Sequence, residues 1–354
     1  MSSWANKRSI WPLLLAAAAI FSGCSLVDED LSDCVTDSHL DYTLTLVTNV
    51  STEISTQLET EISTELELSA ALSIREYLKN IFTDYAHDVD LSFYDVVGDS
   101  VRLHHEEHIM DANQSSYTLH IPVHRYMHTA LANIVENETI RVQDGEHCHR
   151  EKLLQVAADT ISSHSTGLFT ARLPMDIQEG VSQNFDVRLY MANSATAIVI
   201  DTAGSHLKDL RLFATDFATG FSVCDSLYSF GSSSPVVRMD RLSMENSDGC
   251  CFTAVHFPSR NPFDTKIIID SEDPFISPEA ESPLWRIKVY ATLRDGSVTE
   301  TVLGVLKPLH AGELKVIKAR AYESGAVYPV DSTTVGVSVT LDWGSGMEHE
   351  VPLG

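Results

Sequence analysis

The stretch WRIKVYATL (Trp285–Leu293) places an apolar side chain at every second position. These side chains are Trp285, Ile287, Val289, Ala291 and Leu293. A period of two is typical of a β-strand with one face buried and one face wet. Because buried parallel strands read as continuous apolar runs, the alternation indicates an antiparallel sheet.

The same period recurs along the chain, in residues 40–46, 89–93, 117–123, 185–191 and 337–343. The last is the strictest, with Val337, Val339, Leu341 and Trp343 between polar residues. We expect it to be a core strand of a second sandwich rather than an interface element. Many short alternating strands predict an all-β chain made of β-sandwiches.

Two segments depart from this period and predict short helical insertions. Between Ser51 and Phe82, apolar residues recur every four positions, and Ser73 with Glu76 fits a capping box. We predict a helix in the second half, whereas the Thr and Ser content leaves the first half open between helix and loop. His124–Val135 is predicted to be a short helix between strands.

The N-terminus has the layout of a secretory signal: the basic pair Lys7 and Arg8, an apolar run from Ile10 to Phe21, and small residues before Cys24. At about a dozen residues, the apolar run is too short to span a bilayer, which needs ~20. We therefore predict a cleaved segment 1–23. The alternatives for Cys24 are the lipidated cysteine of a lipoprotein and a cysteine that happens to lie near an ordinary cleavage site.

An acidic cluster follows Cys24, and the whole chain has a formal net charge of −26. The cluster is self-repelling, so residues 24–38 are predicted to form an extended tether. A charge this negative argues against binding nucleic acid or an anionic membrane surface through a basic patch.

Two strand-rich halves flank the stretch LPMDIQEGVSQ, which carries Pro174 and Gly180. Such residues are typical of connecting segments. We predict an N-terminal sandwich domain over 39–176 and a C-terminal one over 177–354.

Apart from Cys24, the cysteines are Cys34, Cys148, Cys224, Cys250 and Cys251. In an oxidising compartment an odd number suggests two disulfides and one leftover thiol. Cys34 with Cys148, and Cys224 with Cys250 or Cys251, is one arrangement, but spacing alone does not fix connectivity.

The sharpest catalytic candidate is HHEEH (His104–His108), which matches a zinc motif that needs His104, Glu107 and His108 on one helix. The flanking residues instead predict a strand, on which His104, Glu106 and His108 would share a face. We therefore expect no catalytic zinc.

His147 and His149 flank Cys148, but neighbours on an extended chain point to opposite faces and cannot easily share one ion. The chain has no nucleophile elbow, Walker loop or dinucleotide fingerprint. We expect no enzyme activity, no metal and no cofactor.

Six stretches in order resemble the FimB-like fimbrial anchor lipoproteins, the anchor subunits of type V pili. They are Cys24 with EDLSDC (Glu29–Cys34), LDYTLTLVTN (Leu40–Asn49), DYAHDVDLSFYD (Asp84–Asp95), GEHCHREKL (Gly145–Leu153), LRLFATDFATGF (Leu210–Phe221) and GVSVTLDWGSGMEHEVPLG (Gly336–Gly354). The polar segment Ser51–Leu68 has no counterpart in this resemblance.

The resemblance implies two tandem transthyretin-like β-sandwich domains, a lipid on Cys24 and a place on the cell surface at the outer membrane. It implies no enzyme, but a subunit that holds the pilus and limits its length. Its expected partners are fimbrial shaft subunits, which assemble by β-strand addition. The resemblance does not say which strand accepts the neighbour.

Two other functions stay open. A surface lipoprotein that binds glycans or other ligands would need an exposed aromatic platform. Trp285 and Trp343, the tryptophans left after loss of the signal, have core-facing positions, which weakens this alternative. A zinc hydrolase centred on His104, Glu107 and His108 is the third hypothesis.

Overall fold

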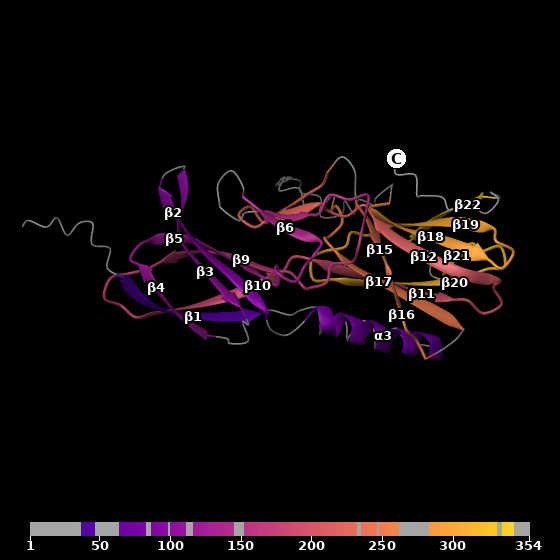
Figure 1. Cartoon of the computed structure of the whole chain (residues 1–354), viewed down its shortest axis with the longest axis horizontal. Helices are drawn as coiled ribbons and strands as arrows, with labels where there is room; N and C mark the ends of the chain where they lie inside the picture. Colours follow the sequence, from indigo (N-terminus) through magenta and orange to yellow (C-terminus); the bar gives the residue numbers. More distant parts are fainter. Residues whose placement is uncertain are drawn as a thin grey trace, which may run out of the picture. The chain divides into compact units, whose positions relative to one another are not determined.

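The structure is a computed structural model that describes residues 37–46, 64–82, 86–97, 100–110, 116–144, 152–231, 235–245, 248–261, 283–330 and 335–342. Strands dominate these residues, which contain one helix, α3 (Glu65–Ile81). The prediction of a mainly β chain is confirmed. Figure 1 shows the arrangement of the elements.

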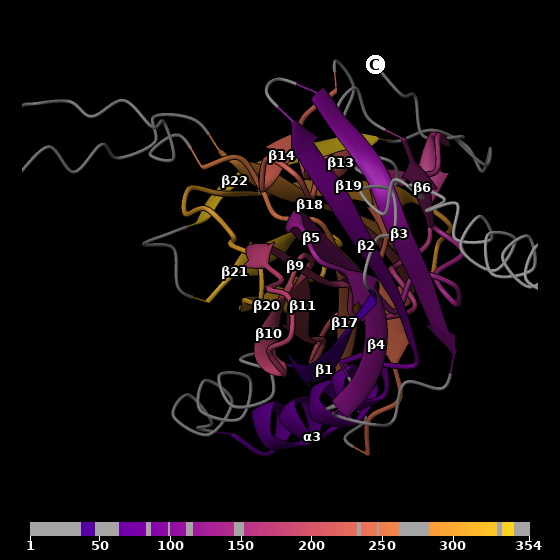
Figure 2. The ribbon, with the colours of Figure 1, turned by 90° about the vertical axis from the view of Figure 1, so that its left-hand side faces the viewer.

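The first sheet has seven strands in the order β3-β2-β5-β9-β10-β1-β4. Their bounds are β1 Asp37–Leu46, β2 Asp88–Val97, β3 Ser100–Met110, β4 Ser116–Pro122, β5 Arg125–Ala132, β9 Phe169–Asp176 and β10 Gln183–Met191. β2 and β3 are the two long strands that run side by side in Figure 2. Leu91 of β2 and Ile121 of β4, from near opposite ends of the sheet, share one buried cluster. The sheet therefore curls around this buried cluster, the first core.

Two further sheets enclose a separate buried cluster, the second core. The second sheet has the order β16-β17-β11-β20-β21, and the third has the order β22-β19-β18-β12-β15-β8. The second comprises β11 Ser194–Asp201, β16 Asp240–Leu242, β17 Gly249–His256, β20 Leu314–Ala321 and β21 Val327–Pro329. The third comprises β8 Thr160–Ile161, β12 Leu207–Thr215, β15 Val236–Arg238, β18 Trp285–Leu293, β19 Val298–Val305 and β22 Val335–Asp342. Side chains such as Ile198, Phe252 and Trp285 fill the space between the two sheets.

A fourth, small sheet has the order β14-β13-β7-β6. Its strands are β6 Ile140–Gln143, β7 Lys152–Gln155, β13 Gly220–Ser222 and β14 Leu227–Ser229. Phe221 and Leu153 belong to a separate buried cluster that also contains Phe257.

α3 contacts β11, β16 and β17 of the second sheet, although it precedes β2 in the chain (Figure 1). β11 is consequently buried on both faces: Ala195 and Ala197 share the cluster that contains α3, whereas Ile198 faces the second core. Tyr77 of α3 donates a hydrogen bond to Asp240 Oδ2 of β16 at 2.6 Å. This contact fixes the helix on the sheet.

The prediction of a helix in the second half of 51–82 is confirmed, but its capping box was wrong. The helix is capped by Thr64, whose Oγ1 accepts from Glu67 N at 3.2 Å while Glu67 Oε2 accepts from Thr64 N at 3.2 Å. Ser73 lies inside the helix, where its hydroxyl bonds to the carbonyls of Ser69 and Ser243. Residues 51–63 lie outside the described residues.

The helix predicted over His124–Val135 is wrong. Arg125–Ala132 is the strand β5, which pairs with β2 on one side and β9 on the other. Its last five residues are all buried. A strand with both faces covered loses the alternation that identifies half-buried strands, which is why the pattern was misleading.

The domain boundary predicted at residues 176/177 does not separate the sheets. β9 and β10, on either side of it, pair with each other. β8, before the boundary, pairs in parallel with β15 of the third sheet, and β7 pairs with β13. The sheets therefore exchange strands across residue 176.

The strands predicted from alternation at 40–46, 89–93, 117–123, 185–191 and 285–293 are all present, although β4 ends at Pro122. Val337–Asp342 lies in β22, which pairs with β19, while Trp343 lies outside the described residues. The proposed signal segment and most of the tether also lie outside them. In the described part of the chain, no helix has the length and apolar character needed to cross a bilayer.

Candidate binding cleft

β9 and β10 separate over most of their length. They pair at only two positions, Thr170 with Tyr190 and Phe169 with Met191. Beyond these, and within the described residues, Ala171–Asp176 pairs only with β5, and Gln183–Leu189 pairs only with β1. No described strand pairs with the edges that the two strands turn toward each other, so their backbone N–H and C=O groups are available to a further strand.

Side chains pin the junction of the strands. Asn193 Oδ1 accepts from Leu168 N at 3.2 Å, and Asn193 Nδ2 donates to Thr166 O at 3.0 Å. At the other end, Gln183 Nε2 donates to Asp176 O at 3.0 Å, and its Oε1 accepts from Gln178 N at 2.9 Å. The opening is thus a slot of fixed length.

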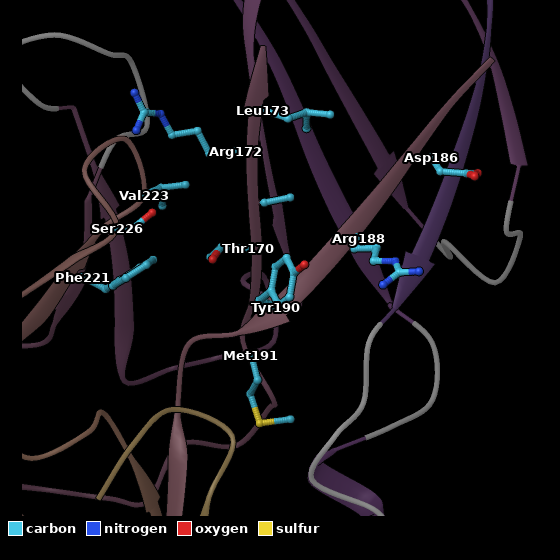
Figure 3. A pocket seen from close by; sticks show the side chains of 11 residues that line it. Thr170, Arg172, Leu173, Asp186, Arg188, Tyr190, Met191, Phe221, Val223 and Ser226 are labelled. Carbon is cyan, nitrogen blue, oxygen red and sulfur yellow. The ribbon is translucent and has the colours of Figure 1, made fainter. Parts of the chain in front are cut away.

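An open cleft of about 550 Å³ lies at this slot, and Figure 3 shows β10 diverging from β9 beside it. It is lined by Thr170, Ala171, Arg172, Leu173, Asp186, Arg188, Tyr190, Met191, Phe221, Val223 and Ser226. Pro174 lies in β9 next to this lining. A proline inside a strand has no N–H to donate and is tolerated where the N–H would face an open edge.

The two faces of the slot differ in chemistry. On the core side, Leu173 and Phe185 remain half-buried, whereas Met175 and Val187 beside them are buried. On the outer side, Arg172, Asp186 and Arg188 are exposed, and Tyr190 is 58% exposed. An added strand could therefore cover apolar side chains on one face and meet charged ones on the other.

The far wall of the cleft is Phe221 of β13. Its ring centroid lies 4.7 Å from that of Tyr228, whose hydroxyl donates to Ala192 O at 2.7 Å. Burial raises the pKa of Tyr228, so this hydroxyl stays a donor. The contact ties the wall to the end of β10.

The arrangement suits an extended peptide. Open edges offer main-chain hydrogen bonds, and alternating side chains would meet the two faces of the slot in turn. The described lining combines charged side chains such as Arg172 and Asp186 with the aromatic rings of Tyr190 and Phe221, groups that suit recognition of a peptide.

The zinc motif of the sequence lies on the edge strand β3, which is a strand as predicted. His105 Nε2 lies 3.0 Å from Glu107 Oε1, and His108 pairs with Asp90. In the described residues no three histidine, cysteine, aspartate or glutamate side chains gather as metal ligands. Charges along a long edge strand hinder pairing with other chains, which accounts for this motif.

The predicted pairing of Cys224 with Cys250 or Cys251 is wrong. Cys250 and Cys251 are both free and buried, whereas Cys224 is disulfide-bonded. Neighbouring residues of β17 point to opposite faces, so Cys250 faces the second core and Cys251 the first. Cys24, Cys34, Cys148, His147 and His149 lie outside the described residues.

Little in the sequence indicates the cleft. The sequence predicts a connection between domains from Pro174 to Gln183, whereas Pro174 lies in β9 and Gln183 begins β10. Pro174 was the available signal, because proline inside a sheet marks an open edge. Trp285 is buried in the second core, as its position predicted.

No protein-family model and no curated protein matches the chain. Solved structures show a distant likeness. The fimbrial anchor protein Mfa2 from Porphyromonas gingivalis has a TM-score of 0.47 at 10% identity, over 86% of this chain and 98% of that one.

A candidate polysaccharide-binding protein from Bacteroides thetaiotaomicron gives a TM-score of 0.48 at 10% identity, over 84% of this chain and 99% of that one. A candidate adhesin from Bacteroides ovatus gives 0.48 at 9% identity, over 85% and 95%. With TM-scores below 0.5 and identities of 9–10%, these likenesses do not assign a function to this chain.

Proposed function

We propose that this chain is a non-enzymatic anchor subunit of a type V pilus, which holds the fibre to the outer membrane and limits its length. The observation that carries the proposal is the open slot between β9 and β10. The lipoprotein-like start of the chain and the ordered resemblance of its sequence to fimbrial anchors support it.

The partner is a fimbrial shaft subunit that supplies an extended strand. About five of its residues pair with the edges of Ala171–Asp176 and Gln183–Leu189, at roughly 3.3 Å per residue. Apolar side chains of this strand cover Leu173 and Phe185, while the alternate ones face Arg172 and Arg188. A slot that is pinned at both ends fixes the register of the added strand.

Anchoring uses the acyl chains on Cys24. A single chain binds a membrane only marginally and two or more bind it stably, because each buried CH₂ contributes about 0.8 kcal/mol. The acidic tether spaces the sandwiches from the membrane at the cell surface. Two tandem transthyretin-like sandwiches are the finer form of this architecture. Because β10 belongs to the first sheet, they do not divide at the predicted boundary of 176/177.

Site-specific photo-crosslinking in cells tests the slot. A benzoylphenylalanine at Tyr190 is expected to capture a fimbrial shaft subunit, identified by mass spectrometry. The matched control is the same residue at Tyr322, which is 49% exposed in the hairpin between β20 and β21. Capture from both positions, or from Tyr322 alone, would contradict strand addition at the slot.

The anchor role is tested separately through Cys24. A Cys24→Ala variant should be found unacylated, and the fibres should be shed into the medium or grow longer. Electron microscopy of fibre length and attachment gives the measurement. Unchanged attachment and length would remove the anchor proposal.

A second candidate function is glycan binding, which one observation favours. Tyr322 and Tyr328, at the hairpin of β20 and β21, are 49% and 40% exposed, and their ring centroids lie 5.3 Å apart. Arg320 pairs in register with Tyr328, and its Nε donates to Asp201 Oδ2 at 3.0 Å. Aromatic faces beside fixed polar groups can hold a sugar ring.

Affinity electrophoresis on a panel of polysaccharides tests this alternative. Retardation that is lost in a Tyr322→Ala, Tyr328→Ala double variant would support it. The control is Tyr190→Ala, which removes an exposed aromatic from the slot instead. Equal mobility of all the proteins across the panel would dispose of glycan binding at this pair.

A further inference from the structure

A second cleft, of about 310 Å³, lies where strands of the second and third sheets begin and end. Its lining comes from the turn Thr202–Ser205 after β11, the start of β12, Arg241 of β16, the start of β17 and Arg294 after β18. It shares no residue with the slot between β9 and β10.

Three basic side chains line this cleft: Lys208, Arg241 and Arg294. Within the part of the chain that the structure describes, none of them makes an ion pair. They outnumber the two acidic lining residues, Asp209 and Asp248. The lining therefore carries a formal charge of +1, in a chain whose formal net charge is −26.

The fold positions the backbone that carries these three exposed side chains. A β-bulge between Leu207 and Asp209 puts Lys208 out of the regular register, and bulges redirect side chains in this way. The guanidinium carbon of Arg241 lies 5.9 Å from the ring centroid of Phe252. Arg294 N donates to His206 O at 3.0 Å, which fixes the backbone beside the cleft.

The turn leaves room for a ligand. Ala203 N donates to Asp201 Oδ1 at 3.0 Å, and Ser205 N donates to Thr202 O at 3.0 Å. Gly204 has a φ of 76°, and a Cβ built on it would meet nothing within 4 Å. The backbone is therefore held in a turn whose apex borders open space.

We propose that this cleft binds a tetrahedral oxyanion, a sulfate or phosphate group, between Lys208, Arg241 and Arg294. Guanidinium groups present paired N–H donors that match such anions, and an ammonium adds a point charge. The cleft lies at the lower end of the volumes typical of ligand pockets, which leaves space for the molecule that carries the anion. The site is independent of the proposed pilus function.

Calorimetric titration of the whole mature chain with inorganic sulfate and inorganic phosphate, at constant ionic strength, tests the proposal. We expect one site per chain, and about tenfold to a hundredfold weaker binding in Arg241→Gln or Arg294→Gln. Arg238→Gln is the matched control, because Arg238 is exposed on β15 and does not line the cleft. Circular dichroism of each variant verifies that it is folded.

The source of the anion is separated by titrating a sulfated monosaccharide against the same sugar without sulfate. Tighter binding of the sulfated sugar than of free sulfate assigns a saccharide ligand, and equal binding assigns a free anion. Binding that is unchanged in both cleft variants means an adventitious ion only and overturns the proposal. Absence of any binding overturns it as well.

Discussion

At the scale of the residue, buried amides hold the first sheet to its neighbours. Asn133 is 1% exposed, has a φ of 61°, and accepts from His87 N at 2.7 Å through Oδ1. Its Nδ2 donates to Gly167 O at 3.0 Å. Asparagine tolerates the left-handed region better than most residues, so backbone and side chain both select it.

Replacing Asn133 by alanine should lower the free energy of unfolding by about 2–4 kcal/mol, because the buried carbonyl of Gly167 and the partly buried N–H of His87 lose their partners. Urea denaturation followed by tryptophan fluorescence measures the loss. Asn184→Ala, at an exposed position of β10, is the control and should cost less than about 0.5 kcal/mol. Equal costs at the two positions would contradict the role assigned to Asn133.

Three buried histidines make stability depend on pH. Burial lowers the pKa of His128 to about 4, and the pKa values of His164 and His256 to about 3. Their neutral forms are compatible with the fold, so their contribution is full above pH 6.5 and is lost as the pH falls toward those values. Burial raises the pKa of Asp88, which acts in the opposite direction.

Between pH 6.5 and about 4, each buried histidine should cost about 1.4 kcal/mol of stability per pH unit. Urea midpoints at several values in this range measure the slope. His128→Gln removes the ring stacked on Phe93 at a centroid distance of 4.3 Å. It should reduce the slope by the contribution of one histidine, about 1.4 kcal/mol per pH unit. A slope that is the same in the variant would mean that His128 is protonated in the folded state.

At the scale of the element, the two faces of α3 differ in how far their side chains are buried. Ile74 and Leu78 are at most 1% exposed against the first core, while Leu72 is 55% exposed. Apolar residues at helical spacing identified the helix. Nothing in its own sequence indicates that its partner is the outer face of β11 and β17, more than 100 positions away.

Leu78→Ala should therefore lower the free energy of unfolding by about 2–5 kcal/mol, through lost burial and a cavity. Leu72→Ala makes the same chemical change on the same helix and should cost less than about 0.5 kcal/mol. Chemical denaturation of both variants gives the comparison. Similar losses in the two variants would contradict the burial of Leu78 and the exposure of Leu72.

At the scale of the whole molecule, the cores draw on residues from both sides of position 176. The first core includes Val187 and Leu189 of β10 and Ala195 of β11. The second includes Ile161 of β8. Neither core is complete within one continuous half of the chain.

A fragment spanning residues 38–176 should consequently fail to fold alone, because it lacks β10 and the sheet that α3 covers. Dispersion of its amide proton NMR signals, compared with that of the chain 38–354, provides the measurement. A well-dispersed spectrum from the fragment would instead establish an independent N-terminal domain.

Cysteine reactivity should also follow the whole fold. Burial raises the pKa of Cys250 to about 11 and that of Cys251 to about 12, so both thiols are protonated as well as inaccessible at pH 8. Alkylation mapped by mass spectrometry should be slow at these positions in the native protein and fast in urea. Rapid native labelling would contradict their burial.

The sequence by itself determined the strands with one wet face, the presence of a helix in the second half of residues 51–82 and the strand character of HHEEH. These depend on local periods of two or 3.6 residues, which neighbouring side chains display whatever the rest of the chain does. The tertiary structure alone decided that β5 is a doubly covered strand, that Cys250 and Cys251 are free, and that β9 and β10 part to leave a slot. Each of these depends on which distant segments meet, and pairing between segments far apart in the chain leaves no periodic trace in either one.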